Sequence, residues 1–267
     1  VPYGTFENCI KTKDFTALEP GVLEYKIYAP GIGVIQEIDA KTGDVKAELT
    51  AIERSPDASY NPSISPANFS NPSNFTNQFF PFEAGKTYVF ESADGSELIE
   101  VTRTGATKMI LGIAAVVVND KVWEDDVLVE DTDDWYAQDN SGNVWYFGEE
   151  VDNYNEDGTF KDHHGSWEAG VDGAKAGITM LANPQRGNAY RQEYFFGEAE
   201  DEAVVVATGL TVTVPYGTFT NVLKTKDFTA LEPGVLEYKY YAPGVGLIKE
   251  EDGFTGEVKV ELMEIRD

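Results

Sequence analysis

Hydrophobic and polar residues alternate along most of the chain after residue 85, which is the pattern of half-buried β-strands. Turn sequences separate the alternating segments. Asp94-Gly95 lies between KTYVFES and ELIEVTRT, and Asn140-Ser141-Gly142 lies between DDWYAQD and NVWYFGEE. The apolar run KMILGIAAVVVND predicts a buried strand pair or one long strand. No segment shows a convincing amphipathic-helix period, so the pattern predicts an all-β protein, an antiparallel meander that forms a strongly curved sheet or barrel.

The two ends of the chain share one pattern. Residues 1–53 align with residues 214–266 without a gap, and 38 of the positions are identical. The sequence between the two copies is not repeated, so the simplest unit spans 213 positions, and the chain holds one whole unit preceded by the tail of another. We therefore expect an extra N-terminal set of strands that repeats the C-terminal ones.

The segment between the first copy and the alternating region is rich in Pro, Ser and Asn and has neither a helical nor a strand period. It reads as an extended linker that docks through phenylalanines, namely Phe69, Phe75, Phe79, Phe80 and Phe82. The predicted organisation is a partial repeat at 1–53, a linker at 54–84 and a main β domain at 85–267. Asn68 and Asn74 match the acceptor pattern for N-glycosylation.

Four longer segments of the main domain are distinctive, namely LVEDTDDWYAQDNSGNVWYFGEE, GSWEAGVDGAKAGITM, YRQEYFFGEAED and KYYAPGVGLIKE. They resemble uncharacterised bacterial secreted proteins and lipoproteins of a mostly-β, half-barrel type related to lipoprotein carriers. The resemblance covers residues 79–267 and, for the last word, residues 1–53 as well. It implies an extracytoplasmic β protein, and it brings no catalytic residues.

Charge and cysteine content narrow the environment and the partners. The chain has 47 acidic and 20 basic residues, a net charge of -27, which disfavours nucleic acid and anionic membranes as partners. The apolar run at 109–118 is too short to span a bilayer. The sequence shows no signal peptide, which a mature secreted chain would have lost, so we expect an extracellular or cell-surface location. The single cysteine, Cys9, corresponds to Val222 in the second copy, which predicts a small apolar core position.

Aromatic and acidic residues are densest between residues 130 and 167. Exposed rings beside carboxylates can stack on sugars, which makes polysaccharide a candidate ligand of Trp135, Tyr136, Trp145, Tyr146 and Trp167. Strand alternation places Trp145 and Phe147 on one face and Tyr146 on the other, so half of these rings are expected in the core. Asp134 and Glu149 could in principle form the carboxylate pair of a glycosidase.

The same region holds candidate metal ligands. The word DNYNEDGT places oxygen ligands suited to Ca²⁺ at Asp152, Asn153, Asn155 and Asp157, without the closing glutamate of an EF-hand; the alternative is a solvated acidic turn. His163 and His164 are candidate ligands of a transition metal. Neighbouring residues of a strand point to opposite faces, however, which opposes a shared ion.

Because no catalytic motif is found, we expect a non-enzymatic protein. The first hypothesis is an extracytoplasmic structural or assembly protein in which residues 1–53 self-associate, pairing with a neighbouring subunit by strand complementation to build a filament. The alternative is a ligand-binding module for a carbohydrate, a lipid or Ca²⁺ on the curved sheet and the hairpin at 130–167. A partial gene duplication, or a slice of a longer tandem protein, would also explain the repeat.

Overall fold

The computed structural model describes residues 1–52, 55–81 and 83–267, so residues 53–54 at the predicted domain boundary and the predicted docking residue Phe82 lie outside the described residues. The chain forms two compact units. The first consists of Val1–Asp57 with Glu232–Val235, and the second of Ala58–Leu231 with Leu236–Asp267.

The described residues are almost entirely β-structure, which confirms the predicted fold class. Their one helix is a 3-10 turn, η1 (Pro66–Asn68), and none of their helices is long and apolar enough to cross a membrane. In the first unit the described strands form a four-stranded antiparallel sheet, here called the N-terminal sheet, in the order β1 (Ile10–Phe15), β2 (Leu23–Ala29), β3 (Gly33–Asp39) and β4 (Val45–Glu48).

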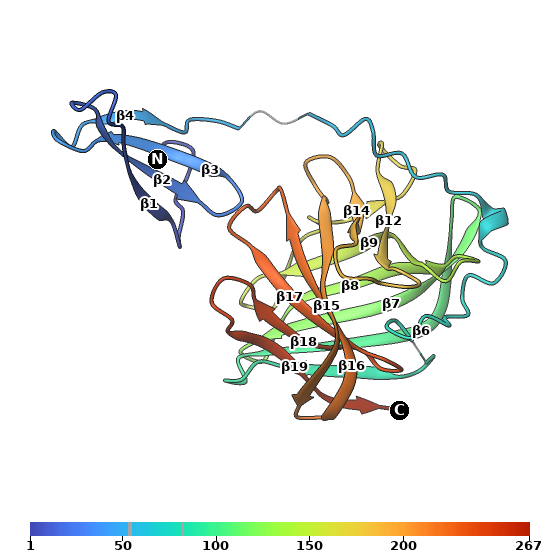
Figure 1. The fold of residues 1–267 in the computed structure, drawn as a ribbon. Coiled ribbons are helices and arrows are strands. Elements are labelled where there is room, and N and C mark those ends of the chain that lie inside the picture. Colours follow the sequence, from blue (N-terminus) through green and yellow to red (C-terminus); the bar gives the residue numbers. More distant parts are fainter. Residues whose placement is uncertain (53–54, 82) are drawn as a thin grey trace. The chain divides into compact units, whose positions relative to one another are not determined.

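The described strands of the second unit form one fifteen-stranded antiparallel sheet, here called the barrel sheet (Figure 1). Its strands in chain order are β5 (Thr87–Glu91), β6 (Glu97–Ile110), β7 (Ile113–Glu124), β8 (Val127–Gln138), β9 (Val144–Tyr154), β10 (Phe160–Asp162), β11 (Trp167–Glu168), β12 (Lys175–Met180), β13 (Ala189–Arg191), β14 (Glu193–Tyr194), β15 (Asp201–Val214), β16 (Gly217–Thr229), β17 (Leu236–Ala242), β18 (Gly246–Asp252) and β19 (Val258–Arg266).

The order of these strands curls the sheet into a nearly closed barrel. The main path runs β13-β15-β16-β17-β18-β19-β5-β6-β7-β8-β9-β12-β14, so the last strand of the chain, β19, pairs with the first strand of the unit, β5. The path starts at β13 and ends at β14. Only Gln192 separates these two strands in the sequence, so the two ends of the sheet meet at this residue. The predicted curved sheet or barrel is therefore confirmed.

The turn sequences produce the expected hairpins. Gly95 adopts a positive φ of 75° between β5 and β6, and Gly142 a φ of 92° between β8 and β9, both backbone conformations that glycine reaches without strain. The apolar run KMILGIAAVVVND forms a strand pair, β6 and β7, which reverses at Leu111 and Gly112.

The N-terminal sheet repeats the last four strands of the barrel sheet residue by residue. Ile10 pairs with Tyr28 as Leu223 pairs with Tyr241, and every other paired position of β1–β4 has its counterpart 213 residues later in β16–β19. The irregularity between Ile27 and Tyr28 recurs at the corresponding place in β17. The predicted repetition of strands is therefore confirmed, and β16–β19 are called the C-terminal meander below.

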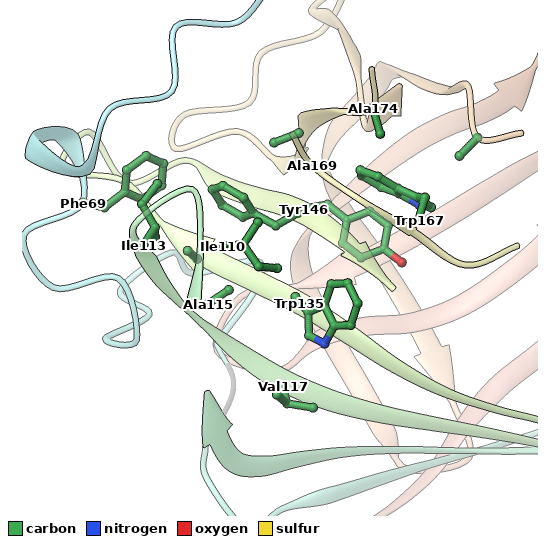
Figure 2. Packing of buried hydrophobic residues seen from close by; sticks show 14 residues of the cluster. Phe69, Ile110, Ile113, Ala115, Val117, Trp135, Tyr146, Trp167, Ala169 and Ala174 are labelled. Atoms are coloured by element: carbon green, nitrogen blue, oxygen red, sulfur yellow. The ribbon is translucent and has the colours of Figure 1, made fainter. Parts of the chain in front are cut away.

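The core of the second unit is rich in aromatic residues. Figure 2 shows one cluster of these residues, with Trp135, Tyr146 and Trp167 among them. Trp135 and Trp167 are each 4% exposed, and Tyr146, on β9, lies between strands β8 and β12. Residues 58–81 belong to this unit, and they contribute two buried rings, Phe69 and Phe79, to its clusters. The segment between the two sheets is thus partly a component of the barrel core.

The expectation for Cys9 is wrong. Cys9 is exposed, whereas Val222, at the same place in the C-terminal meander, is 0% exposed. Val222 is buried because Val214 of β15 and two rings of β5, Tyr88 and Phe90, belong to the same cluster. In the described residues, the N-terminal sheet has no strands that correspond to β15 and β5.

Candidate functional site

A cavity of about 210 Å³ lies within the second unit and is called the acidic cavity below. Strands β5–β8, β12, β17 and β18 contribute to its lining, together with Phe80 and Pro81. Its apolar wall includes Phe80, Phe90, Val101, Val118 and Leu247, and its polar wall includes Asp120, Asp134, Gln192, Lys239 and Glu250. A cavity with apolar walls and a few polar groups is the usual form of a small-ligand site.

Two carboxyl groups from neighbouring strands line this cavity. Val118 of β7 pairs with Asp134 of β8, so Asp120, two residues further along β7, lies on the same face as Asp134. Asp134 is 8% exposed, and its Oδ1 accepts a hydrogen bond of 2.5 Å from the hydroxyl of Tyr146. Oδ1 of Asp120 is buried and has no hydrogen-bond partner among the described residues.

Burial is the main reason why these carboxyls resist ionisation. Loss of hydration raises the pKa of Asp134 to about 7, against the opposing effect of the Tyr146 hydrogen bond. Burial also raises the pKa of Asp120 well above its ordinary value, and the charge of Asp134 adds to the effect. Close by, burial raises the pKa of Glu193 to about 8 and that of Glu149 well above its ordinary range.

Lys239 is the one cation among the described residues that line the acidic cavity. Its Nζ lies 3.6 Å from Glu250 and 3.7 Å from Glu237, and the charge of Glu250 is the main cause of its raised pKa. On the adjacent strand, Thr225 donates a hydrogen bond of 2.5 Å to Asp227, and burial raises the pKa of Asp227 to about 6.

The N-terminal sheet reproduces part of this polar network, although Lys26 pairs with Asp14 where Lys239 pairs with Glu237. Lys26 lies 3.7 Å from Glu37 and 3.5 Å from Asp14, and Thr12 donates a hydrogen bond of 2.9 Å to Asp14. These residues correspond to Lys239, Glu250, Asp227 and Thr225 in the C-terminal meander. The network therefore belongs to the repeated unit, whereas Asp120 and Asp134 come from strands that the first copy does not contain.

The five predicted aromatic ligand residues do not form one exposed row. Tyr136 lines the acidic cavity and stacks on Tyr146, with ring centroids 4.8 Å apart and an interplanar angle of 19°. Tyr146 meets Trp167 edge-on at 5.3 Å. Trp145 lies apart from these rings, and its Nε1 donates a hydrogen bond of 2.9 Å to Asp139. The rings of Trp135, Tyr146 and Trp167 are covered by protein. Tyr146 pairs with Tyr136, so Trp135 lies on the opposite face of the sheet from Tyr146, and rings on both faces are buried.

A second cavity, of about 340 Å³, brings some predicted residues together. Trp135, Trp167 and His163 line it, with Lys108 and the carboxylates Glu149, Glu150 and Glu168. Lys108 Nζ lies 3.3 Å from the ring centroid of Trp135 and 2.9 Å from Glu168. Asp134 and Glu149, the carboxylates considered as a glycosidase pair, stand opposite each other on β8 and β9; Asp134 is buried and Glu149 is half-buried.

The predicted calcium ligands are engaged in local contacts. Asp157 accepts hydrogen bonds from the backbone and hydroxyl of Thr159, and Asn155 donates to the same hydroxyl at 3.0 Å. Asn153 donates to Asp162 at 2.9 Å, and Asp152 lies 2.8 Å from Nδ1 of His163. In the described residues no three His, Cys, Asp or Glu side chains are grouped so that they could hold a metal ion, and calcium binding stays a prediction.

The two histidines follow β10 in a turn. Both are exposed, and His163 Nδ1 also lies 3.0 Å from the carbonyl oxygen of Val151. His164 donates its backbone N–H to Asp162 at 3.0 Å. A transition-metal site at this turn stays a prediction too.

Sequence reasoning did not identify Asp120, Lys239, Glu250 or Gln192 as site residues. The sequence did contain one signal for the ion pair of Lys239 and Glu250. The shared segment GVLEYK is followed in both copies by a glutamate in the next strand, Glu37 in the first and Glu250 in the second. No local signal marked Asp120, which ends an apolar run and meets the other residues only when the barrel closes.

Comparisons with known proteins identify no family, because no family model matches the chain and no curated protein matches it. Two solved structures are similar. One, from Bacteroides fragilis, is named "putative exported protein with YmcC-like fold"; it is 17% identical, with a TM-score of 0.39, over 72% of this chain and 100% of that chain. The other, from Parabacteroides distasonis, is named "putative lipoprotein"; it is 16% identical, with a TM-score of 0.36, over 71% of this chain and 99% of that chain.

Proposed function

We propose that this protein is a non-enzymatic assembly protein that acts outside the cytoplasm and self-associates through its N-terminal sheet. The location follows from the resemblance of its sequence words to bacterial secreted proteins and lipoproteins. The observation that carries the self-association is the contrast between two copies of one meander, of which one is covered by neighbouring strands and the other exposes the same positions.

The covered copy defines what the exposed copy lacks. Leu223, Tyr241 and Leu247 of the C-terminal meander pack in a cluster with Phe79, Met180 and Val205. Their counterparts are adjacent on β1, β2 and β3, where Ile10 is 67% exposed and Val34 41% exposed. Contiguous apolar residues on a solvated sheet face are characteristic of an interaction surface.

Strand edges lead to the same conclusion. In the C-terminal meander, β16 pairs with β15 and β19 pairs with β5. In the described part of the N-terminal sheet, no further strand pairs with β1 or β4. Open edges carry unpaired N–H and C=O groups, which favour the addition of strands from another chain.

A second N-terminal sheet is the partner that leaves no meander of either chain uncovered. The places beside β15 and β5 are already filled by β16 and β19 of the same chain. Each chain has two meanders and one set of strands β5–β15, so completion of a neighbour's barrel always leaves one meander over. Two N-terminal sheets from two chains can cover each other and leave none over, which gives a closed dimer with a two-fold axis.

Charge also favours this surface for contact between like chains. Residues 1–52 contain five lysines and eight acidic residues, a net charge of -3 out of the -27 of the chain. The remaining residues carry most of the negative charge and repel a second copy more strongly. The N-terminal sheet is therefore the part of the chain where self-contact meets the least repulsion.

The full-length chain tests this proposal. Sedimentation velocity should show a monomer that becomes a dimer as concentration rises. The Ile10→Glu variant should stay monomeric. Met109→Glu is the matched control, because Met109 is 64% exposed in the second unit, and this variant should dimerise normally.

Three results would contradict the proposal. A chain that stays monomeric at all concentrations would rule out self-association. Equal dimerisation of the Ile10→Glu variant would place the interface elsewhere. Open-ended growth into filaments would contradict the closed pairing of two N-terminal sheets.

A further inference from the structure

The acidic cavity contains more carboxyl groups than its one cation can pair with. Lys239 is engaged with Glu250 and Glu237. Asp120 and Asp134 line the same cavity, and Asp134 is held by the hydroxyl of Tyr146. Asp120 Oδ1 is buried without a hydrogen-bond partner among the described residues, so it is the group that a positively charged occupant would complete.

The aromatic residues of the lining indicate the chemistry of the rest of the ligand. Five aromatic residues line the cavity, namely Phe80, Tyr88, Phe90, Tyr136 and Tyr241, and the ring centroids of Phe80 and Tyr136 lie 5.1 Å apart. Aromatic faces attract cations and accommodate apolar groups. A site with an unpaired carboxyl group beside aromatic rings therefore suits a ligand that combines a positive charge with an apolar body.

We propose that the acidic cavity binds a small organic ammonium compound, with its nitrogen at Asp120 and Asp134 and its apolar body among the rings of Phe80, Phe90 and Tyr136. The volume of about 210 Å³ sets the size. A cavity of about 150 Å³ in another protein is known to hold benzene. The acidic cavity therefore has room for one six-membered ring with a short aminoalkyl arm.

Other ligand classes fit the lining less well. The described residues offer no group of three ligating side chains for a metal ion. A neutral sugar would bring no positive charge to the carboxyl groups, which are costly to ionise in a buried site. An organic anion would meet Asp120, Asp134 and Glu250, and Lys239 is already paired with Glu250.

Binding of an ammonium group should be coupled to proton release. Burial and the carboxyls of Asp134, Glu130 and Glu250 raise the pKa of Asp120, against the opposing ammonium of Lys239, so in the empty cavity Asp120 holds its proton more tightly than it would in water. A cation beside this carboxyl favours its ionised form, and the released proton leaves to the buffer. A ligand without charge has no such effect.

Calorimetric titration of the full chain at pH 7 with benzylamine and with benzyl alcohol tests the proposal, because the two probes share a ring and differ in charge. Benzylamine should bind at least tenfold more tightly, and its heat should change between buffers of different ionisation enthalpy. Asp120→Asn should lose at least tenfold in affinity. Asp125→Asn, an exposed change in the β7–β8 turn, is the matched control and should bind as the original chain does.

Equal affinity for benzyl alcohol, no buffer dependence, or full affinity in Asp120→Asn would each overturn the proposal. Asp120→Asn changes a buried carboxyl, so its folding needs a control. Urea unfolding should show that this variant is folded. Asp134→Asn supplies a second test, with a smaller loss of affinity expected, since Tyr146 already holds that carboxyl. Ile10→Glu should bind benzylamine normally, so failure of the ligand proposal and failure of self-association are distinguishable.

Discussion

Ile10 and Leu223 occupy the same position in two copies of one four-stranded meander, yet Ile10 is 67% exposed and Leu223 is 0% exposed. Both lie opposite a tyrosine, Tyr28 and Tyr241 respectively. Backbone pairing is therefore the same in the two copies, and the difference in burial comes from the tertiary surroundings. One chain thus contains its own comparison between a packed sheet and an open one.

Truncation of these two side chains should have unequal effects. Leu223→Ala should lower the free energy of unfolding by about 2–5 kcal/mol, because it leaves a cavity in a packed cluster. Ile10→Ala should change it by less than about 0.5 kcal/mol at concentrations where the chain is monomeric. Urea unfolding followed by far-ultraviolet circular dichroism measures both, and an equal loss would mean that Ile10 is covered in the monomer.

The two equivalent lysines allow a similar comparison. Lys239 and Lys26 have the same side-chain exposure, 28%, but Lys239 lies in a cavity inside the barrel sheet and Lys26 on the N-terminal sheet. Lys239→Met leaves Glu237 and Glu250 without their partner and should cost about 2 kcal/mol, less than for a fully buried pair. Lys26→Met should cost less, because its ion pairs are open to solvent. The same urea titrations compare them, and a larger loss in Lys26→Met would contradict this assignment.

The fold could be predicted from the sequence because its signals are local. Alternation marks most of the longer strands, and turn pairs such as Asp94-Gly95 mark where they reverse. Repetition carried more information than either, since it predicted the strands of the N-terminal sheet from those of the C-terminal meander. The burial of Cys9 was inferred from the same repetition and was wrong, because burial depends on the strands that cover a sheet and not on the sheet alone.

The acidic cavity could not be predicted, because its residues are brought together by long-range pairing. Asp120 and Lys239 are far apart in sequence and line one cavity only because β19 pairs with β5 and the sheet curls. The aromatic hairpin was visible as a cluster, but which rings are covered depends on β11 and β12, which pair with β9 from a distance. Tyr136 pairs with Tyr146 and lines the acidic cavity, whereas Trp145, next to Tyr146 on β9, takes the other face of the sheet.

Stability should fall as pH rises from about 4 to 7, in contrast to proteins whose carboxylates are held by cations. Burial raises the pKa of Asp134 to about 7 and that of Asp227 to about 6, so the folded chain holds protons that the unfolded chain releases. Each such group lowers the free energy of unfolding by up to about 1.4 kcal/mol per pH unit in this window.

Asp134→Asn removes one of these protons and should flatten the pH dependence between about pH 4.5 and 6.5. Asp94 is the matched control, because hydrogen bonds from Ser96 and Ser92 lower its pKa to about 2, and Asp94→Asn should leave that window unchanged. Urea titrations at several pH values measure the slopes. A slope in Asp134→Asn as steep as in the original chain would show that Asp134 is ionised in the folded state.

The closure of the barrel sheet depends on a close approach at Gly177 of β12. A Cβ atom on this residue would overlap the backbone of Gln192, the residue at which the two ends of the sheet meet. Gly177→Ala must push β12 and the segment around Gln192 apart, so we expect a loss of about 1–3 kcal/mol. Gln192 also lines the acidic cavity, so this displacement should weaken the binding of any ligand there.

Gly217→Ala is the control, because its Cβ would meet only the ring of Phe219 at an ordinary distance of 3.8 Å. Urea unfolding followed by tryptophan fluorescence reports the second unit, which holds every tryptophan of the chain. Equal stability of the two variants would mean that the ends of the sheet are not in close contact at Gln192, and that the barrel is more open than this packing requires.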